Sequence, residues 1–146
     1  MNILFICKHN RFRSKVAEAF WKKFFKNDGR FTVQSAGVQC DPARAYVARY
    51  VHQVMKEHET KIVDERPRVV DDAVLERAER IIIVADNVDK NIFSAEVQKK
   101  CEVWKIEDAD ESELEKIRDI VIKIKRRIIG LGEQLGVERN ASIENS

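Results

Sequence analysis

Residues 3–20 read ILFICKHNRFRSKVAEAF, and this stretch predicts both the fold and the chemistry of the chain. The apolar run at residues 2–7 has the length of a buried strand, whereas the residues from Ser14 onward carry apolar side chains at helical spacing. Residues 8–13 are therefore a predicted turn from a strand into the N-terminus of a helix. Unpaired backbone N–H groups gather at such a terminus and attract anions.

Two side chains flank this turn, Cys7 and Arg13. Five intervening residues are enough to wrap a tetrahedral oxyanion, with the thiol below it and the guanidinium beside it. An arginine fork binds two phosphate oxygens at once, and the helix end together with Arg13 favours the thiolate form of Cys7. A cysteine at a strand end is also an ordinary small buried residue, and a Cys-x5-Arg-Ser pattern can arise by chance. The position between a strand and a helix favours a phosphate-handling nucleophile.

Length and composition set the class of protein. A chain of 146 residues predicts one domain, which we expect to span residues 1–136, followed by a polar, flexible tail at residues 137–146. The net charge of +2 comes from nearly balanced acids and bases, which argues against nucleic acid or a membrane as partner. Three cysteines without a Cys-x-x-Cys or Cys/His cluster argue against a disulfide scaffold or structural zinc. We expect a cytoplasmic monomer that uses no metal and no cofactor.

Strands and helices alternate along the rest of the chain. The expected strands cover residues 31–35, 80–85 and 101–106, and Ala36-Gly37 is expected to break the first of them. The expected helices run from Asp41-Pro42 to about His58, from Asp71 or Asp72 through Ala78, over residues 89–99, and from a capping box at Ser112-x-x-Glu115 to a stop at Gly136. Residues 58–68 are expected to form a loop.

This alternation predicts an α/β fold with a parallel sheet covered by helices on both faces. In such sheets ligands bind outside the carboxyl ends of the strands, near a topological switch point. Cys7 ends the first strand and so lies at that edge. The other segments expected there are Ser35-Ala36-Gly37, Asp86-Asn87 and Glu107-Asp108.

Several segments resemble one known family in their order and spacing: the quoted stretch, Ser35-Ala36-Gly37, the IIIVADN run at residues 81–87, and the aspartate after WKIE. The chain is similar to the low-molecular-weight protein tyrosine phosphatases and the related thioredoxin-coupled arsenate reductases. The resemblance covers nearly the whole chain. It implies a four-stranded parallel sheet in the order 2-1-3-4, with the phosphate-binding loop after strand 1, and a two-step reaction through a cysteinyl-phosphate.

The resemblance also implies roles for individual residues. Cys7 matches the nucleophile and Arg13 the phosphate-binding arginine. Ser14 matches the hydroxyl that stabilises the thiolate. Asn10 matches the asparagine that shapes the loop, a role that fits the tolerance of asparagine for left-handed backbone.

A general acid must protonate the leaving oxygen once the thiolate attacks phosphorus. The family places an Asp-Pro pair in the loop after the last strand, where this chain has Asp108-Ala109. Asp108 is therefore the expected acid, and afterwards the base that activates the hydrolytic water. The missing proline leaves Asp110 as a competitor for the role.

Other departures from the family concern the substrate. His9 and Phe12 replace a frequent glycine and a frequent second cysteine. Lys8, His9 and Arg11 make the loop more cationic than one phosphate requires, which either attracts a more highly charged substrate or is ordinary surface charge. No aromatic residue follows Asp108 to frame a phosphotyrosine ring; Tyr46 either supplies one or packs on a helix. The expected substrate-binding set is Lys8, His9, Asn10, Arg11, Phe12 and Ser14.

We expect a cysteine-dependent phosphomonoester hydrolase acting on a phosphorylated protein or a small aryl phosphate, with protein phosphotyrosine as the first candidate. One alternative is an arsenate reductase that uses an external thiol, because residues 85–100 lack the relay cysteines that the reductase family implies. A second alternative is a non-catalytic phosphate- or phosphopeptide-binding module. Nucleic-acid binding through Lys123, Lys125, Arg126 and Arg127 is weakly indicated, since basic charge near a helix C-terminus is favourable in itself.

Overall fold

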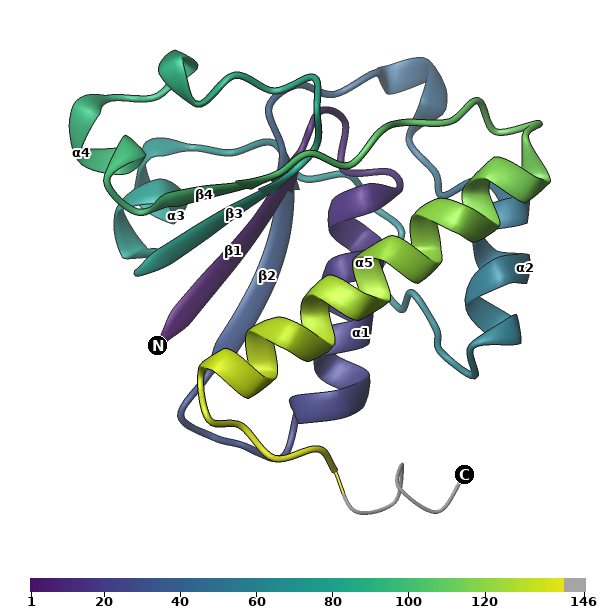
Figure 1. The fold of residues 1–146 in the computed structure, drawn as a ribbon. Helices are drawn as coiled ribbons and strands as arrows, with labels where there is room; N and C mark the ends of the chain where they lie inside the picture. Colours follow the sequence, from purple (N-terminus) through teal and green to yellow (C-terminus); the bar gives the residue numbers. More distant parts are fainter. Residues whose placement is uncertain (141–146) are drawn as a thin grey trace.

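The computed structural model describes residues 1–140 and places four parallel strands in one sheet (Figure 1). The strand order β2-β1-β3-β4 confirms the expected 2-1-3-4 arrangement. All four strands end at the same edge of the sheet, because parallel neighbours share one direction. The strands are β1 (Asn2–Cys7), β2 (Thr32–Gly37), β3 (Arg80–Val84) and β4 (Cys101–Trp104).

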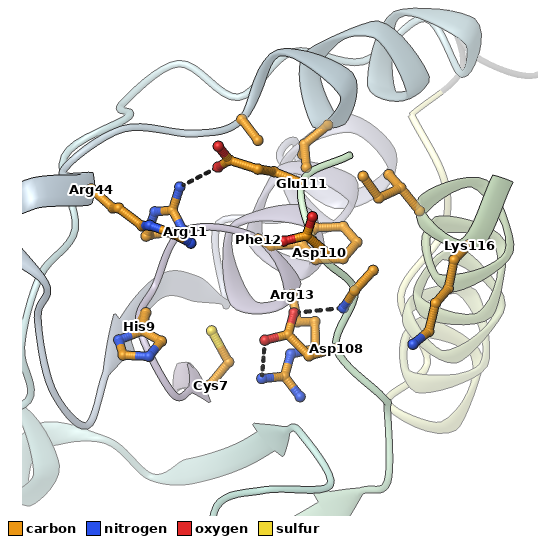
Figure 2. A pocket seen from close by; sticks show the side chains of 14 residues that line it. Cys7, His9, Arg11, Phe12, Arg13, Arg44, Asp108, Asp110, Glu111 and Lys116 are labelled. Carbon is orange, nitrogen blue, oxygen red and sulfur yellow. Dashed lines mark hydrogen bonds and ion pairs between the residues drawn. The ribbon is translucent and has the colours of Figure 1, made fainter. Parts of the chain in front are cut away.

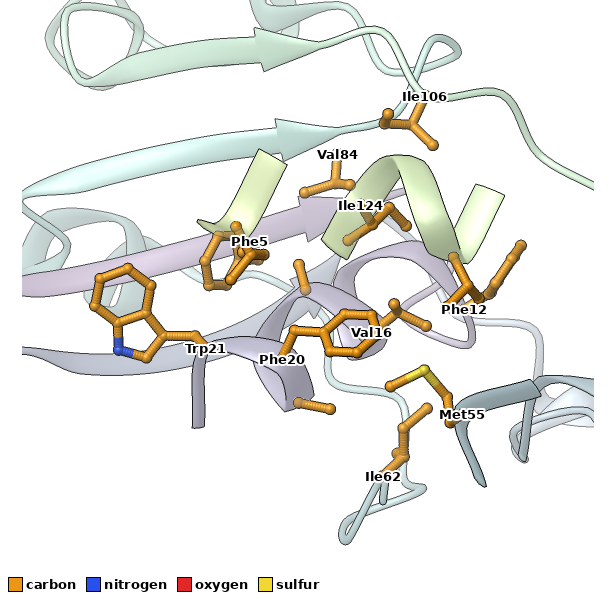
Figure 3. Close-up of a cluster of buried hydrophobic side chains, with 14 of the residues drawn as sticks. Phe5, Phe12, Val16, Phe20, Trp21, Met55, Ile62, Val84, Ile106 and Ile124 are labelled. Atoms are coloured by element: carbon orange, nitrogen blue, oxygen red, sulfur yellow. The ribbon is translucent and has the colours of Figure 1, made fainter. Parts of the chain in front are cut away.

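Helices cover both faces of the sheet, as the alternation of elements predicts. On one face lie α1 (Arg13–Phe25), α2 (Arg49–Glu57) and the long α5 (Leu114–Gln134) (Figure 1). The short helices α3 (Asp72–Arg77) and α4 (Ala95–Gln98) lie on the other. Along β1 the buried side chains alternate between these layers. Phe5 joins the larger core under α1 and α5 (Figure 3), whereas Leu4 and Ile6 join the smaller one.

The apolar stripe expected along the last helix forms the cover of the larger core. The expected stripe consists of six residues that are buried in α5 (Ile117, Ile120, Val121, Ile124, Ile128 and Leu131) and of Leu135 just after the helix. The helix stops where expected: Gly136 takes φ +69, and the amide of Val137 donates to the carbonyl of Gly132 at 2.9 Å. Beyond it, the Asn140 side chain donates to the Lys23 carbonyl at 2.8 Å, and residues 141–146 of the expected tail lie outside the described part.

Two expected helices are wrong in extent. The segment after Asp41 forms a 3-10 turn (Pro42–Arg44) in which Asp41 does cap the amide of Ala43, but α2 begins only at Arg49. Between them Val47 and Ala48 turn inward and are buried, so core packing overrides the continuous helical pattern. Residues 89–99 likewise form a 3-10 turn (Lys90–Ile92) and the separate α4. Asp89 and Ser94 each cap a new start there.

Smaller boundary differences follow from hydrogen bonds that the pattern does not reveal. β2 continues through Ala36 and Gly37, since Gly37 pairs with Cys7. β4 ends at Trp104, two residues earlier than expected. The Ser112–Glu115 capping box is wrong: α5 begins at Leu114 without a side-chain cap, because the Ser112 hydroxyl donates to Asp110.

Candidate active site

Residues 8–12 form the loop that joins β1 to α1, with Cys7 buried at its base (Figure 2). The loop lies directly against β2. A Cβ added to Gly37 would lie 2.8 Å from the backbone nitrogen of Asn10 and from the carbonyl carbon of His9. Only glycine permits this approach, which explains the glycine at the end of β2 in terms of the loop beside it.

Asn10 holds the loop through its backbone and its side chain. Its φ of 53° lies in the left-handed region, as its residue type predicts. Its buried amide donates to the hydroxyl oxygens of Ser14 at 2.7 Å and Ser35 at 3.0 Å, and its carbonyl oxygen accepts from the amide of Arg68 at 2.9 Å. Ser35 in turn donates to Glu18 at 2.8 Å. These bonds connect the loop to α1, to β2 and to the segment after α2.

The Cys7 sulfur lies 2.9 Å from the hydroxyl oxygen of Ser14. Because Asn10 donates to that same oxygen, the Ser14 proton is free to point at the sulfur. A hydroxyl that donates to sulfur stabilises a thiolate. The geometry therefore matches the role that the family resemblance implies for Ser14.

Arg13 is the first residue of α1 and is almost completely buried. Its guanidinium donates to the carbonyl of Ile106 and to the side-chain oxygen of Asn87, both at 2.9 Å. Two carboxylates lie near it, Asp86 at 3.7 Å and Asp108 at 3.5 Å. A buried arginine needs this compensation, and the two hydrogen bonds fix the plane of its fork beside Cys7 (Figure 2).

The two candidate acids occupy different environments. Asp108 contacts Arg13 and lines the same pocket as Cys7 (Figure 2), and its carboxylate also accepts from the amide of Ala109 at 2.9 Å. Asp110 instead accepts from the hydroxyl and the amide of Ser112. These hydrogen bonds lower the pKa of Asp110 below its ordinary value, the side-chain bond contributing most. The geometry brings Asp108, rather than Asp110, to Arg13.

A pocket of about 390 Å³ opens over the loop (Figure 2). The sequence-predicted residues in its lining are Cys7, His9, Arg11, Phe12, Arg13 and Asp108. The remaining lining residues are Arg44, Ala48, Val51, Ala109, Asp110, Glu111, Lys116 and Ile117. Three expected substrate-binding residues are not in the lining: Asn10 and Ser14 are buried under the loop, and Lys8 is half-buried beside it.

Charged and polar side chains at the mouth of the pocket are partly paired with one another. Arg11 donates to Glu111 at 3.1 Å and to the carbonyl of Tyr46 at 3.0 Å. Tyr46 is exposed and is absent from the pocket lining, so it frames no ring there. His9 lines the pocket next to Cys7, and its Nδ1 atom is buried without a hydrogen-bond partner within residues 1–140.

Sequence reasoning missed three contributors to the site. Asn87 and Asp86 were expected at this edge of the sheet but without a role, and they orient and compensate Arg13. Glu111 was not among the expected site residues, yet it pairs with Arg11. The available signal for Asp86 and Asn87 was their position: they are polar and closely follow the buried run of β3. A contact one hundred residues apart, such as Arg11–Glu111, has no local signal.

Neither of the other two cysteines lines the pocket of Cys7. Cys101 begins β4 at the opposite end of the strands. The register places it three residues and two strands from Cys7, on the order of 14 Å away. Cys40 is exposed in the loop after β2. Over the described residues no group of three or more His, Cys, Asp or Glu side chains is arranged to hold a metal ion, and no helix is long and apolar enough to cross a membrane.

The chain matches the model of the low molecular weight phosphotyrosine protein phosphatase family over residues 2–141. It belongs to this family. The family assignment agrees with the strand order and with the cysteine–arginine loop after β1.

Known members with several activities are similar to the chain. Arsenate reductase 1 of Staphylococcus saprophyticus is 27% identical over 120 residues, which cover 80% of this chain and 87% of the relative. An arsenate reductase structure from Archaeoglobus fulgidus superposes with a TM-score of 0.72 at 27% identity, covering 88% and 97% of the two chains. The YwlE arginine phosphatase of Geobacillus stearothermophilus shares the fold, with a TM-score of 0.77 at 21% identity and 92% of each chain covered. The similar proteins thus carry the names of different enzymes, an arsenate reductase and an arginine phosphatase, on one fold.

Proposed function

We propose that the protein is a phosphomonoester hydrolase that acts on aryl phosphates through a cysteinyl-phosphate intermediate. One observation carries this proposal: the Cys7 thiol, the Arg13 guanidinium and the Asp108 carboxyl group meet in a single pocket over the loop. Nucleophile, phosphate-binding cation and proton donor are the three components that such a hydrolase needs.

In the first step the phosphoryl group lies over the loop, held by its N–H groups and by the Arg13 fork. The Cys7 thiolate attacks phosphorus, and the bond from phosphorus to the ester oxygen breaks. Asp108 gives its proton to that oxygen, so the leaving group departs as a neutral alcohol or phenol.

In the second step Asp108 is a carboxylate and takes a proton from water. The water oxygen attacks phosphorus, the phosphorus–sulfur bond breaks, and Cys7 leaves as a thiolate that Ser14 stabilises. Inorganic phosphate is released, and Asp108 is protonated again for the next cycle.

The apolar part of the pocket supports an aryl leaving group. Phe12, Ala48, Val51, Ala109 and Ile117 contribute apolar surface to its lining, and such a surface accepts a ring more readily than a charged or sugar-like group. Protein phosphotyrosine is the aryl phosphate that this proposal places first.

The test is turnover of p-nitrophenyl phosphate in the presence of EDTA. We expect steady release of p-nitrophenol by the wild-type protein. Cys7→Ser should abolish turnover while leaving the circular dichroism spectrum and melting temperature close to those of the wild type. Arg13→Ala should lose both substrate binding and turnover. Absence of EDTA-resistant turnover by the wild type would contradict the proposal.

Arsenate reduction is the second candidate, favoured by the arsenate reductases among the similar proteins. Here the Cys7 thiolate would attack arsenate and release water, and an external thiol would then attack the Cys7 sulfur. That attack releases arsenite and leaves a mixed disulfide on Cys7, so the two thiols supply the two electrons. Thiol-dependent arsenite formation by the same preparation, without phosphatase turnover, would favour this candidate.

A further inference from the structure

One cluster of side chains connects three loops around the mouth of the pocket. Arg11, in the loop after β1, donates through Nε to the carbonyl of Tyr46 and through a terminal nitrogen to the carboxylate of Glu111. The Tyr46 hydroxyl donates to the same carboxylate at 3.3 Å, and the Arg11 guanidinium lies 4.9 Å from the centre of the Tyr46 ring. Arg11, Tyr46 and Glu111 are called the Arg11 clamp below.

Through Glu111, the Arg11 clamp is connected to the loop that carries Asp108, the proposed acid. Glu111 is three residues after Asp108, in a segment that has no helix or strand between β4 and α5. The resemblance implies a proline after the aspartate, but this chain has Ala109, so the backbone angle there is not fixed by a ring. Asp108 itself is about half exposed, and its side-chain partners are the Ala109 amide and Arg13.

The burial of Arg11 indicates that its positive charge is used to bind Glu111 and the carbonyl of Tyr46. Its side chain is 16% exposed, and two of its donors are used by the clamp. A guanidinium is a planar fork whose bonds restrict orientation as well as distance. Neutralisation by Glu111 also leaves Arg11 less charge to offer to a substrate, which argues against the more highly charged substrate as the reason for this arginine.

We propose that the Arg11 clamp holds the loop of Asp108 so that this carboxyl group stays beside Arg13 in the pocket of Cys7, in place of the proline that the family resemblance implies. This inference rests on the proposed function, since positioning an acid matters only if Asp108 protonates a leaving group. Arg11 and Glu111 are positioning residues: they act through Asp108.

The test compares two substrates that differ in their need for an acid. Phenol has a pKa of about 10, like tyrosine, so the phenolate anion leaves slowly unless it is protonated. The p-nitrophenolate anion is a much weaker base than phenolate and depends less on an acid. We expect Glu111→Gln and Arg11→Gln each to raise the ratio of kcat/KM for p-nitrophenyl phosphate to that for phenyl phosphate by about tenfold, because a displaced catalytic group loses efficiency steeply. The double variant should show the same ratio as either single variant, because the two residues act as one unit.

Glu57→Gln is the matched control. Glu57 pairs with Arg118 between α2 and α5, and its exposure is similar to that of Glu111, but it lies outside the pocket lining. In Glu57→Gln the ratio of kcat/KM for the two substrates should equal that of the wild type. An unchanged ratio in both clamp variants, or additive effects in the double variant, would overturn the positioning role.

A second measurement separates this inference from the proposed function. Amide hydrogen exchange of residues 108–113, measured without substrate, should be faster in Glu111→Gln than in the wild type and unchanged in Glu57→Gln. Equal exchange in all three proteins contradicts the clamp even if the wild type is inactive. Wild-type inactivity toward both substrates, by contrast, contradicts the proposed function.

Discussion

At the scale of single residues, the site depends on which atom donates each hydrogen bond. The Ser14 oxygen accepts from the Asn10 amide, so the Ser14 proton is available for the Cys7 sulfur. The Asn10 amide is held in turn by Ser35 and by its left-handed backbone. A substitution of Asn10, Ser14 or Ser35 should therefore alter the hydrogen bond to the Cys7 sulfur, although none of the three side chains lines the pocket.

Ser14→Ala should make the Cys7 thiolate less available. A hydrogen bond to a charged group contributes about 1.5–3 kcal/mol, so we expect alkylation of Cys7 by iodoacetamide near pH 6 to slow by roughly tenfold or more. Peptide mass spectrometry measures this rate. The exposed Cys40 of the same molecule is an internal control whose rate should not change. Equal slowing at both cysteines, or none at Cys7, would contradict the role given to Ser14.

Asp108 and Asp110 are distinguished by their contacts, and the matched pair of amide variants tests this. Asp108→Asn should lower kcat/KM for phenyl phosphate by about 10²–10⁴, the range for a general acid, and lower it less for p-nitrophenyl phosphate. Asp110→Asn should have a small effect on both, because that carboxylate is engaged by Ser112. The reverse ranking of the two variants would assign the acid to Asp110.

At the scale of elements, the contact between α1 and α5 depends on the absence of a side chain. A Cβ on Gly132 would overlap the ring of Phe25, which is itself packed against Trp21 and Phe24. Two residues earlier, Gly130 has no atom near its Cβ position. The same helix therefore provides a glycine that packing requires and one that it does not.

Gly132→Ala should lower the free energy of unfolding by about 1–3 kcal/mol through overpacking, despite the better helix propensity of alanine. Gly130→Ala should raise it by up to about 1 kcal/mol from propensity alone. Urea unfolding followed by circular dichroism measures both. Two variants with the same sign would show that the α1–α5 contact is not as tight as described.

His58, at the C-terminus of α2, gives the fold a pH dependence. Burial lowers the pKa of His58 below the ordinary value of 6.5, and the charges of Lys125 and Lys23 lower it further, while Glu57 opposes them. The Lys125 nitrogen lies 3.2 Å from Nδ1 of His58. Because the unfolded chain then binds the proton first, this contribution to stability is complete above pH 6.5 and is lost as pH falls from there toward the folded pKa.

The wild-type melting temperature should therefore fall between pH 7 and pH 5.5, and His58→Gln should fall less over the same interval. Differential scanning calorimetry at several pH values measures the two slopes. Parallel slopes would exclude His58 as the source of the effect.

At the scale of the whole molecule, the alternation of strands and helices predicted a parallel sheet between two helical layers, whereas the strand order 2-1-3-4 was implied by the family resemblance. Three segments were sufficient to predict the main buried elements: the apolar run of β1, the IIIV run of β3 and the apolar stripe of α5. In each of them the local spacing of apolar residues indicates burial. The parallel order then placed Cys7, Asn87 and Asp108 at one edge. The short elements were predicted less well: burial of Val47 and capping by Ser94 divide segments whose pattern reads as continuous helix.

The candidate site was predictable where the motif is local and unpredictable where it is not. Cys7, Asn10, Arg13 and Ser14 lie within eight residues, and their contacts follow from one strand-to-helix turn. The partners that orient them come from distant loops: Ile106 and Asn87 bind Arg13, and Glu111 binds Arg11. Such contacts depend on how loops from different strands meet at the sheet edge, which spacing within one segment does not encode.

The central claim is that Cys7 carries the phosphoryl group during turnover. Intact-protein mass spectrometry of a reaction with p-nitrophenyl phosphate, quenched in acid during steady state, measures this directly. We expect one added phosphoryl group, located on the peptide that contains Cys7 and absent in Cys7→Ser. Rapid turnover with no phosphoryl group on Cys7, or with one on another residue, would contradict the account.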